Sequence, residues 1–511
     1  MFTLSRTLSS LFQFPFTKTT GVWWAAIVLT VATPLESADP PWILMKSAHF
    51  EVISNAGEGS ARNVTWQFEQ IRAVISALWP WARVDLTQPL SVLAVKDEST
   101  MRALAPAYWE RKTDVRPASV SVGGADRPYL AIRADLRADD RALLNPYITA
   151  YHSYATLVIQ SSMAHPFPLW LSRGLSGVIS NTIVRENAIS IGPAIPWHLQ
   201  RLRGGSRLPL SEVLAVTYGS PEFSDGERLS RFDAQSWALV HYLMFGNEGQ
   251  RRSQLDRLMA LINGGKDPAA AIKETIGNIQ DLEGPLKVYV EQVLFPMMKA
   301  SADLSVKREA FAARPMPPAE SSSARAAFHV AMRRPVEARA LIDEARKADP
   351  NAPWSYSAEG LLFDRDDKPE EARKAFAVAT ERGSIDAYAY YRLARLELRG
   401  NPDRDTLTQV EQHARRATEL NDRFASAYSL LAEARSALDP KTDGATPLVR
   451  RAIALEPLEP GHRLTAARVL WRKGNYADAL VEARAALALS RNDQERAVAQ
   501  DTIKGIEAAA R

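Results

Sequence analysis

The stretch Pro369–Ser384, PEEARKAFAVATERGS, sets the register of the C-terminal part of the chain. It is a helical pattern with small residues on one face, and related stretches precede and follow it at a nearly constant interval. Between successive members of the first series the interval is 34, 34, 38 and 35 residues. The alignment gives two series of small residues: Ala326, Gly360, Ala394, Ala432 and Ala467, and Ala345, Ala379, Ala417, Ala452 and Ala486.

A period near 34 residues, with small side chains where paired helices cross, is typical of a tetratricopeptide array. A bulky residue at a crossing would push the two helices apart. We therefore expect residues 323–511 to form an all-α tetratricopeptide superhelix of about five repeats, followed by a final helix near 493–510. The stretch Arg314–Ser323, RPMPPAESSS, is rich in Pro and Ser and predicts a linker, which we place at 301–322.

Residues 42–300 have a different pattern. Three stretches have strand character because they are rich in β-branched residues: His49–Ser54, Leu90–Val95 and Pro128–Leu136. Between the first two, Gly57–Leu78 has apolar residues at helical spacing, and the pattern is mainly helical after Asp140. This order predicts an α+β domain with a small sheet packed on helices.

The composition excludes several classes of function. The chain has 511 residues, of which 46% are hydrophobic and 24% charged, as expected for a packed protein. It has no cysteine, so disulfides, Cys-ligated zinc, iron–sulfur clusters and thiol catalysis are excluded. The net charge is only +4 and no lysine-rich run is present, so we expect no nucleic-acid partner.

The N-terminus has the pattern of a bacterial secretory signal. Arg6 and Lys18 precede the apolar run Val22–Ala32, VWWAAIVLTVA, and small residues follow it. This run is shorter than the ~20 residues that span a bilayer. We expect residues 1–38 to be a signal peptide, cleaved after Ala32 or Ala38, and the mature protein to be periplasmic or secreted. The alternative is an uncleaved inner-membrane anchor, which would be the chain's only membrane contact and would make it a membrane-attached structural component.

The stretch Tyr151–Ser180, YHSYATLVIQSSMAHPFPLWLSRGLSGVIS, predicts two helices separated by Pro166 and Pro168. Zinc peptidases of the H-E-x-x-H kind place two histidines one helical turn apart with a glutamate between them. The chain resembles the bacterial peptidase-MA-like family of gluzincin-type metallopeptidases over about 42–296. It keeps His152, Tyr154, PLWL, the Gly-Leu pair that follows, and the aromatic stretch Phe232–Gly246. The resemblance implies a gluzincin-like fold for residues 42–300.

The resemblance also implies that the zinc motif is degenerate. It places Ser153 at the catalytic glutamate, Thr156 at the second histidine and Arg173 at the acidic third ligand, so that His152 is the one ligand kept. A hydroxyl cannot act as a general base near neutral pH. A positive charge ~4 Å from a divalent ion costs about 8 kcal/mol at an effective dielectric of about 20. We expect no bound zinc, no other cofactor and no catalytic residue in this domain.

Other roles for these residues remain open. His165 offers a second nitrogen from which a metal site could be rebuilt, and the alternative function is an active zinc metallopeptidase with an unconventional ligand set. A serine hydrolase is disfavoured because adjacent helical residues such as His152 and Ser153 do not face each other. Arg173 is expected to pair with a carboxylate such as Glu186, or to hold an anionic ligand. For His241 we expect core packing.

A tetratricopeptide array implies a function in protein binding, with the first helix of each repeat lining a concave groove. Arginine suits carboxylates and flat aromatic rings bury apolar surface, so we hypothesise an extended acidic peptide or a protein C-terminus as the ligand of an exported scaffold. The alternative is that these arginines form a solvated face with local acidic partners. The candidates are Trp354, Arg365, Tyr391, Arg395, Arg399, Arg468, Trp471 and Arg472.

Overall fold

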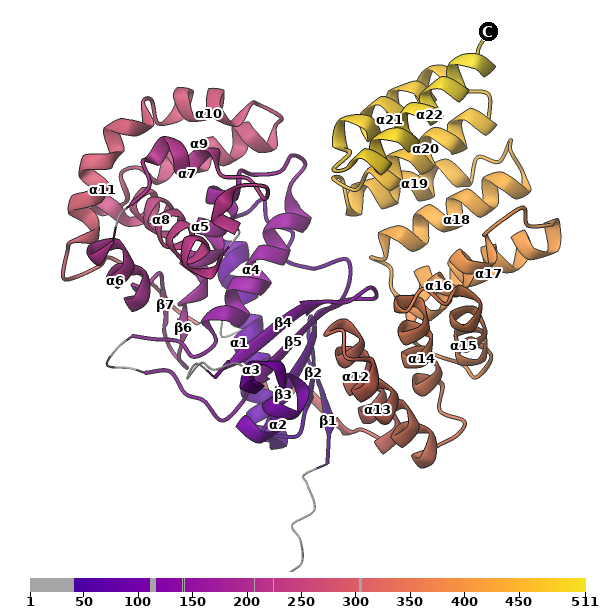
Figure 1. Ribbon diagram of the computed structural model, residues 1–511, viewed down its shortest axis with the longest axis horizontal. Coiled ribbons are helices and arrows are strands. Elements are labelled where there is room, and N and C mark those ends of the chain that lie inside the picture. The colour runs from indigo at the N-terminus through magenta and orange to yellow at the C-terminus, as the bar shows by residue number, and fades with distance from the viewer. Residues whose placement is uncertain are drawn as a thin grey trace, which may run out of the picture. The chain divides into compact units, whose positions relative to one another are not determined.

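The computed structural model describes residues 41–110, 116–139, 141, 143–205, 207–223, 225–302 and 306–511 (Figure 1). The expected signal peptide or anchor, 1–38, lies outside the described residues. In the described part of the chain, no helix has both the length and the apolar character needed to cross a bilayer.

The first part of the described chain is built on a mixed six-stranded sheet with the order β4-β5-β3-β2-β1-β9. The central pairs β2–β3 and β3–β5 are parallel, whereas β1–β2, β1–β9 and β4–β5 are antiparallel. The expected N-terminal sheet domain is therefore present. Its strands are β1 (Ile43–Lys46), β2 (Glu51–Ser54), β3 (Ser91–Val95), β4 (Ser119–Gly123), β5 (Pro128–Arg133) and β9 (Ala312–Pro315).

Side chains of β3 alternate between two cores, as the two-residue period of a strand requires. Val92 and Ala94 belong to the large core that contains α1 (Gly57–Leu78) and α4 (Ile148–Ser162). Leu93 and Val95 face a second core, formed with α2 (Glu98–Leu104) and with Phe328 of α12 (Pro318–Ala331). The sheet is thus covered by helices on both faces.

After β5 the N-terminal region consists mainly of helices. Val240 and Ser236 of α8 (Gly226–Phe245) approach α5 (Leu169–Ser180) so closely that a Cβ on Gly174 would lie 2.5 Å from the Ser236 carbonyl oxygen. The further elements of this region are α3 (Ala107–Glu110), α5 (Leu169–Ser180), β6 (Ile183–Val184), β7 (Ile189–Ile191), α6 (Pro196–Gly204), α7 (Leu210–Ala215), η1 (Pro221–Phe223), α8 (Gly226–Phe245), η2 (Gly246–Gly249), α9 (Arg252–Asn263), α10 (Pro268–Thr275), η3 (Ile279–Leu282), α11 (Glu283–Val290), β8 (Met298–Ala300) and η4 (Arg308–Ala310).

The C-terminal part is a series of helical hairpins, which confirms the predicted helical repeat array (Figure 1). The small crossing residues Ala326, Ala394 and Ala467 are completely buried, and Gly360 faces the ring of Phe376. After α12, the helices are α13 (Pro335–Ala348), α14 (Pro353–Arg365), α15 (Pro369–Glu381), α16 (Ala387–Glu397), α17 (Arg404–Leu420), α18 (Ala425–Leu438), α19 (Ala445–Leu455), α20 (Pro460–Arg472), α21 (Tyr476–Leu489) and α22 (Asp493–Ala509).

Much of the described part of the segment 301–322, expected to be a linker, forms regular secondary structure. β9 pairs with β1 at the edge of the sheet, and α12, the first repeat helix, begins at Pro318 rather than at Ser323. Phe328 of this helix packs edge-on against Tyr129 of β5, with ring centroids 6.2 Å apart. The first repeat and the sheet therefore share a core. Strand pairing and burial give regular structure to a segment whose composition alone indicates a loop.

Candidate functional site

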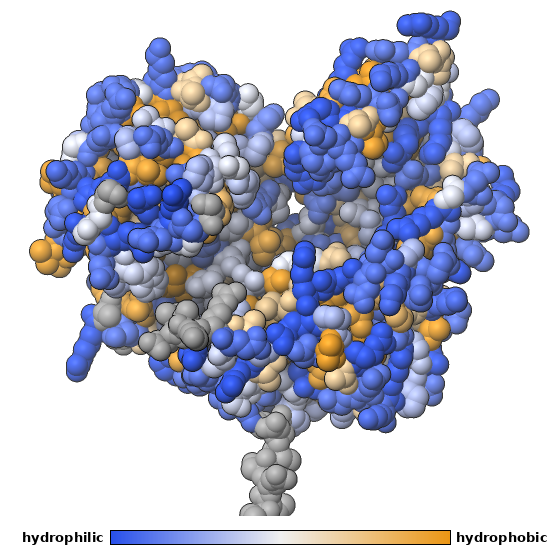
Figure 2. All heavy atoms as spheres, in the orientation of Figure 1, coloured by the Kyte–Doolittle hydropathy of each residue, from blue (hydrophilic) through white to orange (hydrophobic). Residues whose placement is uncertain are grey.

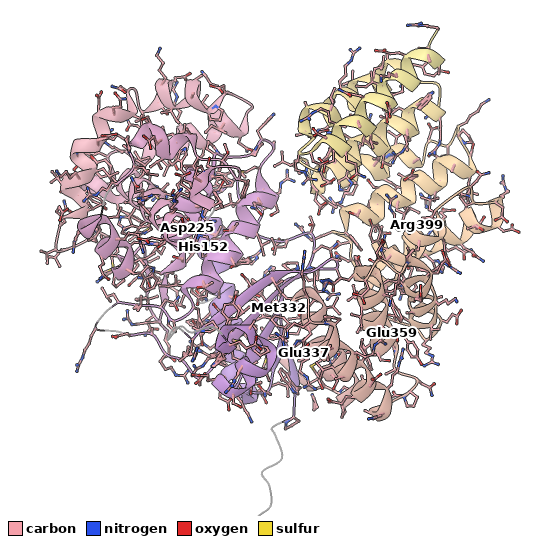
Figure 3. All side chains as sticks on the ribbon, in the orientation of Figure 1. His152, Asp225, Met332, Glu337, Glu359 and Arg399 are labelled. Atoms are coloured by element: carbon pink, nitrogen blue, oxygen red, sulfur yellow. The ribbon has the colours of Figure 1, made fainter. Side chains whose placement is uncertain are left out.

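Four helices bring His152 (α4), Arg173 (α5), Asp233 (α8) and His198 (α6) together; Figure 3 labels His152 among them. Arg173 donates two hydrogen bonds to Asp233, and the Nη2–Oδ2 distance is 2.7 Å. His152 lies within electrostatic range of both partners, and His198 within range of Asp233 and His152. The ion pair therefore stands beside two imidazoles.

Both histidines are neutral at neutral pH. The pKa of His152 is lowered to about 4, chiefly by burial and also by the positive charge of Arg173, while Asp233 opposes the shift. Burial also lowers the pKa of His198 to about 4, against the opposing effect of Asp233. The His198 Nδ1 atom is buried and has no hydrogen-bond partner among the described residues.

The hydroxyl groups expected in the degenerate zinc motif are used in local contacts. Ser153 Oγ lies 2.8 Å from Ser121 Oγ on β4. Thr156 Oγ1 lies 2.8 Å from the His152 carbonyl oxygen and 2.9 Å from Ser176 Oγ on α5. These contacts join α4 to its neighbours and do not supply metal ligands.

Arg173 pairs with a carboxylate, as expected, but its partner is Asp233 and not Glu186. Glu186 lies 3.7 Å from Arg308, whereas Arg173 binds Asp233 because the close packing of α5 on α8 carries that carboxylate to it. Sequence reasoning missed Asp233 and His198. Asp233 is the second residue of the aromatic stretch Phe232–Gly246, FDAQSWALVHYLMFG. Its place in that stretch was the sequence feature that could have marked it as a site residue.

The side chains present do not fit the zinc ion that the resemblance implies. A catalytic zinc site needs three protein ligands, usually histidines and carboxylates. Here Asp233 is occupied by Arg173, and no cluster of three or more His, Cys, Asp or Glu residues in the described ranges could hold a metal. His165 lies elsewhere, with Nδ1 3.0 Å from the carbonyl oxygen of Asn263, the last residue of α9, so it adds no ligand to this group.

His241 is a core residue, as its sequence context indicates. Its ring is completely buried, with Nδ1 2.8 Å from the Tyr289 hydroxyl and Nε2 2.7 Å from the Gly192 carbonyl oxygen. Burial lowers its pKa to about 4. These contacts join α8 to α11 and to the chain after β7.

In the array, part of the predicted arginine set gathers around Glu433 of α18. Arg395 of α16 lies 3.8 Å and Arg468 of α20 lies 3.3 Å from this carboxylate. Arg472, one turn further along α20, donates to Ser436 Oγ at 2.9 Å. No sequence signal pointed to Glu433, which is one of many acidic residues on repeat helices.

The other predicted groove residues have separate roles. Trp354 packs among buried alanines of the first two repeats and lines a cavity of about 830 Å³ between the sheet and α12, α14 and α16. Tyr391 packs on Phe424, with ring centroids 4.8 Å apart. Arg365 donates to the Val330 carbonyl oxygen at 2.6 Å.

Trp471 and Arg399 do not join the arginine group either. A Cβ on Gly505 of α22 would lie 2.8 Å from the Trp471 ring, so this ring packs against the final helix. Arg399 is exposed beyond the end of α16 (Figure 3). The visible face of the array is predominantly hydrophilic (Figure 2).

Solved structures similar to this chain include tetratricopeptide proteins. YrrB, a TPR protein with an unusual peptide-binding site, is 18% identical, with 36% of this chain and 92% of that chain covered and a TM-score of 0.30. TTC0263, a thermophilic TPR protein of Thermus thermophilus, is 20% identical, with 36% and 99% covered and a TM-score of 0.29. Yeast Tom70 is 13% identical, with 56% and 61% covered and a TM-score of 0.29.

No family model matches the chain, and no curated protein matches it. The similarities to solved structures are at low identity and low TM-score. The repeat geometry itself, with its buried small residues at the helix crossings, is therefore the evidence for the array.

Proposed function

We propose that this chain is an exported scaffold that binds proteins or peptides through its tetratricopeptide array, and that its N-terminal domain is a metallopeptidase-like domain without a metal site. The observation that carries the proposal is the ion pair between Arg173 and Asp233 beside His152. A guanidinium group and its bound carboxylate fill the place where a peptidase of this kind would hold a cation and its acidic ligand.

The electrostatics of this place support the loss of metal binding. Arginine stays protonated in proteins, so Arg173 keeps a positive charge next to the surviving histidine. Asp233 is also engaged in a charge-assisted pair, which a metal would have to break before the carboxylate could act as a ligand. Each factor weakens binding of a divalent cation at His152.

The arginines around Glu433 support an acidic ligand for the array. Arg395 and Arg468 pair with the Glu433 carboxylate and Arg472 lies within electrostatic range of it, so the combined charge of the group is positive. Burial lowers the pKa of Arg472, and although Glu433 opposes the shift, Arg468 adds to it, which shows that the positive charges crowd one another. A peptide carboxylate or a free C-terminus would relieve this crowding through paired hydrogen bonds.

Metal analysis tests the first half of the proposal. The full chain is dialysed against a slight excess of zinc and then against buffer, and the metal is measured by mass spectrometry. We expect no stoichiometric zinc. One zinc ion per chain, lost on His152→Ala, would instead favour the active metallopeptidase with an unconventional ligand set.

A binding titration tests the second half. A fluorescent acidic decapeptide with a free C-terminal carboxylate is added to the full chain, to Arg395→Glu and to Arg468→Glu. Each reversal is expected to weaken binding at least tenfold, about 1.4 kcal/mol. Arg373→Glu on α15 is the matched control, since Arg373 forms a local pair with Glu370 of the same helix, at 3.2 Å. Equal affinities for all four proteins would reject the arginine group as the binding site.

Export is tested separately. Cells producing the chain are fractionated into periplasm, membrane and cytoplasm, and the purified protein is sequenced from its N-terminus. We expect periplasmic protein that begins after Ala32 or Ala38. Membrane-bound protein with an intact N-terminus would favour the anchored form.

A further inference from the structure

The segment Arg83–Leu90 lies between α1 and β3 and contains no helix or strand. One side of it is held by its own domain, since the Tyr154 hydroxyl donates to the Val84 carbonyl oxygen at 3.1 Å and Arg72 pairs with Asp85 at 2.6 Å. Its other side is bound by the repeat array. The segment is thus an irregular stretch of chain held between two surfaces.

One turn of the array binds three consecutive backbone carbonyls of this segment. Arg423, in the turn between α17 and α18, donates to the carbonyl oxygens of Asp85 and of Leu86, the latter at 3.4 Å. Asn421 in the same turn donates to the Thr87 carbonyl oxygen at 3.1 Å. Every residue has a backbone carbonyl oxygen, so this turn recognises the backbone conformation of the segment and not its side chains.

The next turn recognises a side chain. Glu456, between α19 and α20, accepts a hydrogen bond from the Thr87 hydroxyl at 2.6 Å. Asn421 and Glu456 are equivalent positions, because each is the first residue after the second helix of its repeat. The same position in two successive repeats thus contacts one segment: Asn421 binds the backbone carbonyl of Thr87, and Glu456 binds the Thr87 hydroxyl.

Both turns are held in place by bonds within the array. The Asn421 side chain accepts from the backbone amide of Arg423 at 3.0 Å. The other carboxylate oxygen of Glu456 lies 3.1 Å from His462 Nε2, and His462 Nδ1 lies 2.8 Å from Ser429 Oγ. Burial raises the pKa of Glu456, but the bonds from His462 and Thr87 outweigh it and hold this pKa below its ordinary value, so the acceptor is ionised. Fixed side chains of this kind form a preorganised site.

We propose that Asn421, Arg423 and Glu456 form a second peptide-binding site of the array, separate from the arginines around Glu433 and occupied in cis by Arg83–Thr87. Its partners are extended protein segments that carry Ser or Thr at the position of Thr87. The inference rests on the proposed protein-binding function of the array. A partner segment competes with the tethered one, whose effective concentration is high because it is part of the same chain.

The test uses a labelled synthetic peptide of residues 81–90, WARVDLTQPL, titrated into the full chain and its variants. Thr87→Val removes the hydroxyl from the tethered segment at nearly the same shape. It should therefore loosen that segment and improve affinity for the added peptide about tenfold, as expected for one hydrogen bond to a charged acceptor. Adding Arg423→Ala to the Thr87→Val chain should abolish binding, and a peptide with Val in place of Thr should bind about tenfold more weakly.

Three outcomes would overturn the proposal: equal affinity of the peptide for the unmodified and Thr87→Val chains, no binding to either, or binding that survives Arg423→Ala. Circular dichroism checks that each variant folds, and Arg423→Lys replaces Arg423→Ala if the latter unfolds. The acidic decapeptide is titrated into the same proteins. Its binding should not change on Arg423→Ala, so failure of the arginine site and failure of this second site give different results.

Discussion

Arg173 is held by Asp233 through both oxygens of the carboxylate, with 2.7 Å between Nη2 and Oδ2. The two residues come from α5 and α8 and are 60 positions apart in the chain. Their side chains are about one quarter exposed. The pair thus fixes the contact between two helices beside His152.

This ion pair should contribute measurably to stability. Arg173→Ala leaves the Asp233 carboxylate without its partner and should lower the free energy of unfolding by about 1–3 kcal/mol. Adding Asp233→Ala should recover part of that loss, because the second change removes the unpaired charge. Urea unfolding of the single and double variants gives the coupling energy of the cycle.

The exposed pair Arg416–Glu419, at 3.0 Å, is the matched control for this cycle. Its coupling energy should be below about 1 kcal/mol, as is usual for surface pairs. A coupling energy for Arg173 and Asp233 that is no larger than the control value would show that the pair has no structural role.

Restoring the motif should create a metal site if the proposed ancestry is right. The combination Ser153→Glu, Thr156→His and Arg173→Glu returns two histidines and two glutamates to α4 and α5 and removes the repelling charge. We expect this variant to bind stoichiometric zinc, measured by isothermal titration calorimetry, whereas the unmodified chain should bind none because Arg173 keeps its positive charge beside His152 and holds Asp233. Absence of zinc from the triple variant would count against the alignment of Ser153, Thr156 and Arg173 with the zinc motif.

The helix crossings of the array should tolerate no added volume. A Cβ on Gly360 would lie 2.6 Å from the ring of Phe376, which is completely buried. Gly360→Ala should therefore lower the free energy of unfolding by about 1–3 kcal/mol, as overpacking does. Gly59→Ala in α1 is the control: nothing lies within 4 Å of its added Cβ, so it should be neutral or stabilising by up to about 1 kcal/mol. Thermal unfolding distinguishes the two, and equal effects would contradict the predicted close approach.

Stability should depend on pH through the buried histidines. Burial lowers the pKa of His241 from 6.5 to about 4, so between these values the unfolded chain binds a proton that the folded chain does not. The free energy of unfolding should then fall as the pH is lowered from 6.5, by up to about 1.4 kcal/mol per pH unit for this group, and the contribution should be constant above 6.5. Urea unfolding at pH 7, 6 and 5 measures the slope.

A His241→Gln variant should show a shallower slope over the same range. The exposed His165, replaced by glutamine, serves for comparison, because its ring lies at the surface. An unchanged slope in His241→Gln would mean that this buried ring does not produce the acid sensitivity.

Much of the secondary structure follows from local patterns. The helix expected over Gly57–Leu78 is α1, and the helix pair around Pro166 and Pro168 is α4 and α5. The strands expected at His49–Ser54, Leu90–Val95 and Pro128–Leu136 correspond to β2, β3 and β5. These elements are predictable because their buried side chains recur at the period of the backbone.

The edge strand β9 was not predictable from a local pattern of apolar residues. All four residues of β9 are exposed, and its last residue is Pro315. Its place in the sheet depends on hydrogen bonds with β1, which is distant in the chain and leaves no trace in composition. For this reason a segment with the composition of a linker joins the sheet to the first repeat.

The amino-acid sequence alone determined the periodic features: the repeat register, the small residues at the helix crossings and the strands and helices with regular apolar spacing. Each of these depends on steric and hydrophobic patterns that act over a few neighbouring residues. Tertiary structure decided which polar groups meet: that Arg173 binds Asp233, that Arg395 and Arg468 share Glu433, and that Thr87 reaches Glu456. Such pairings depend on how distant helices and turns pack, and many residues of the same type could have formed them.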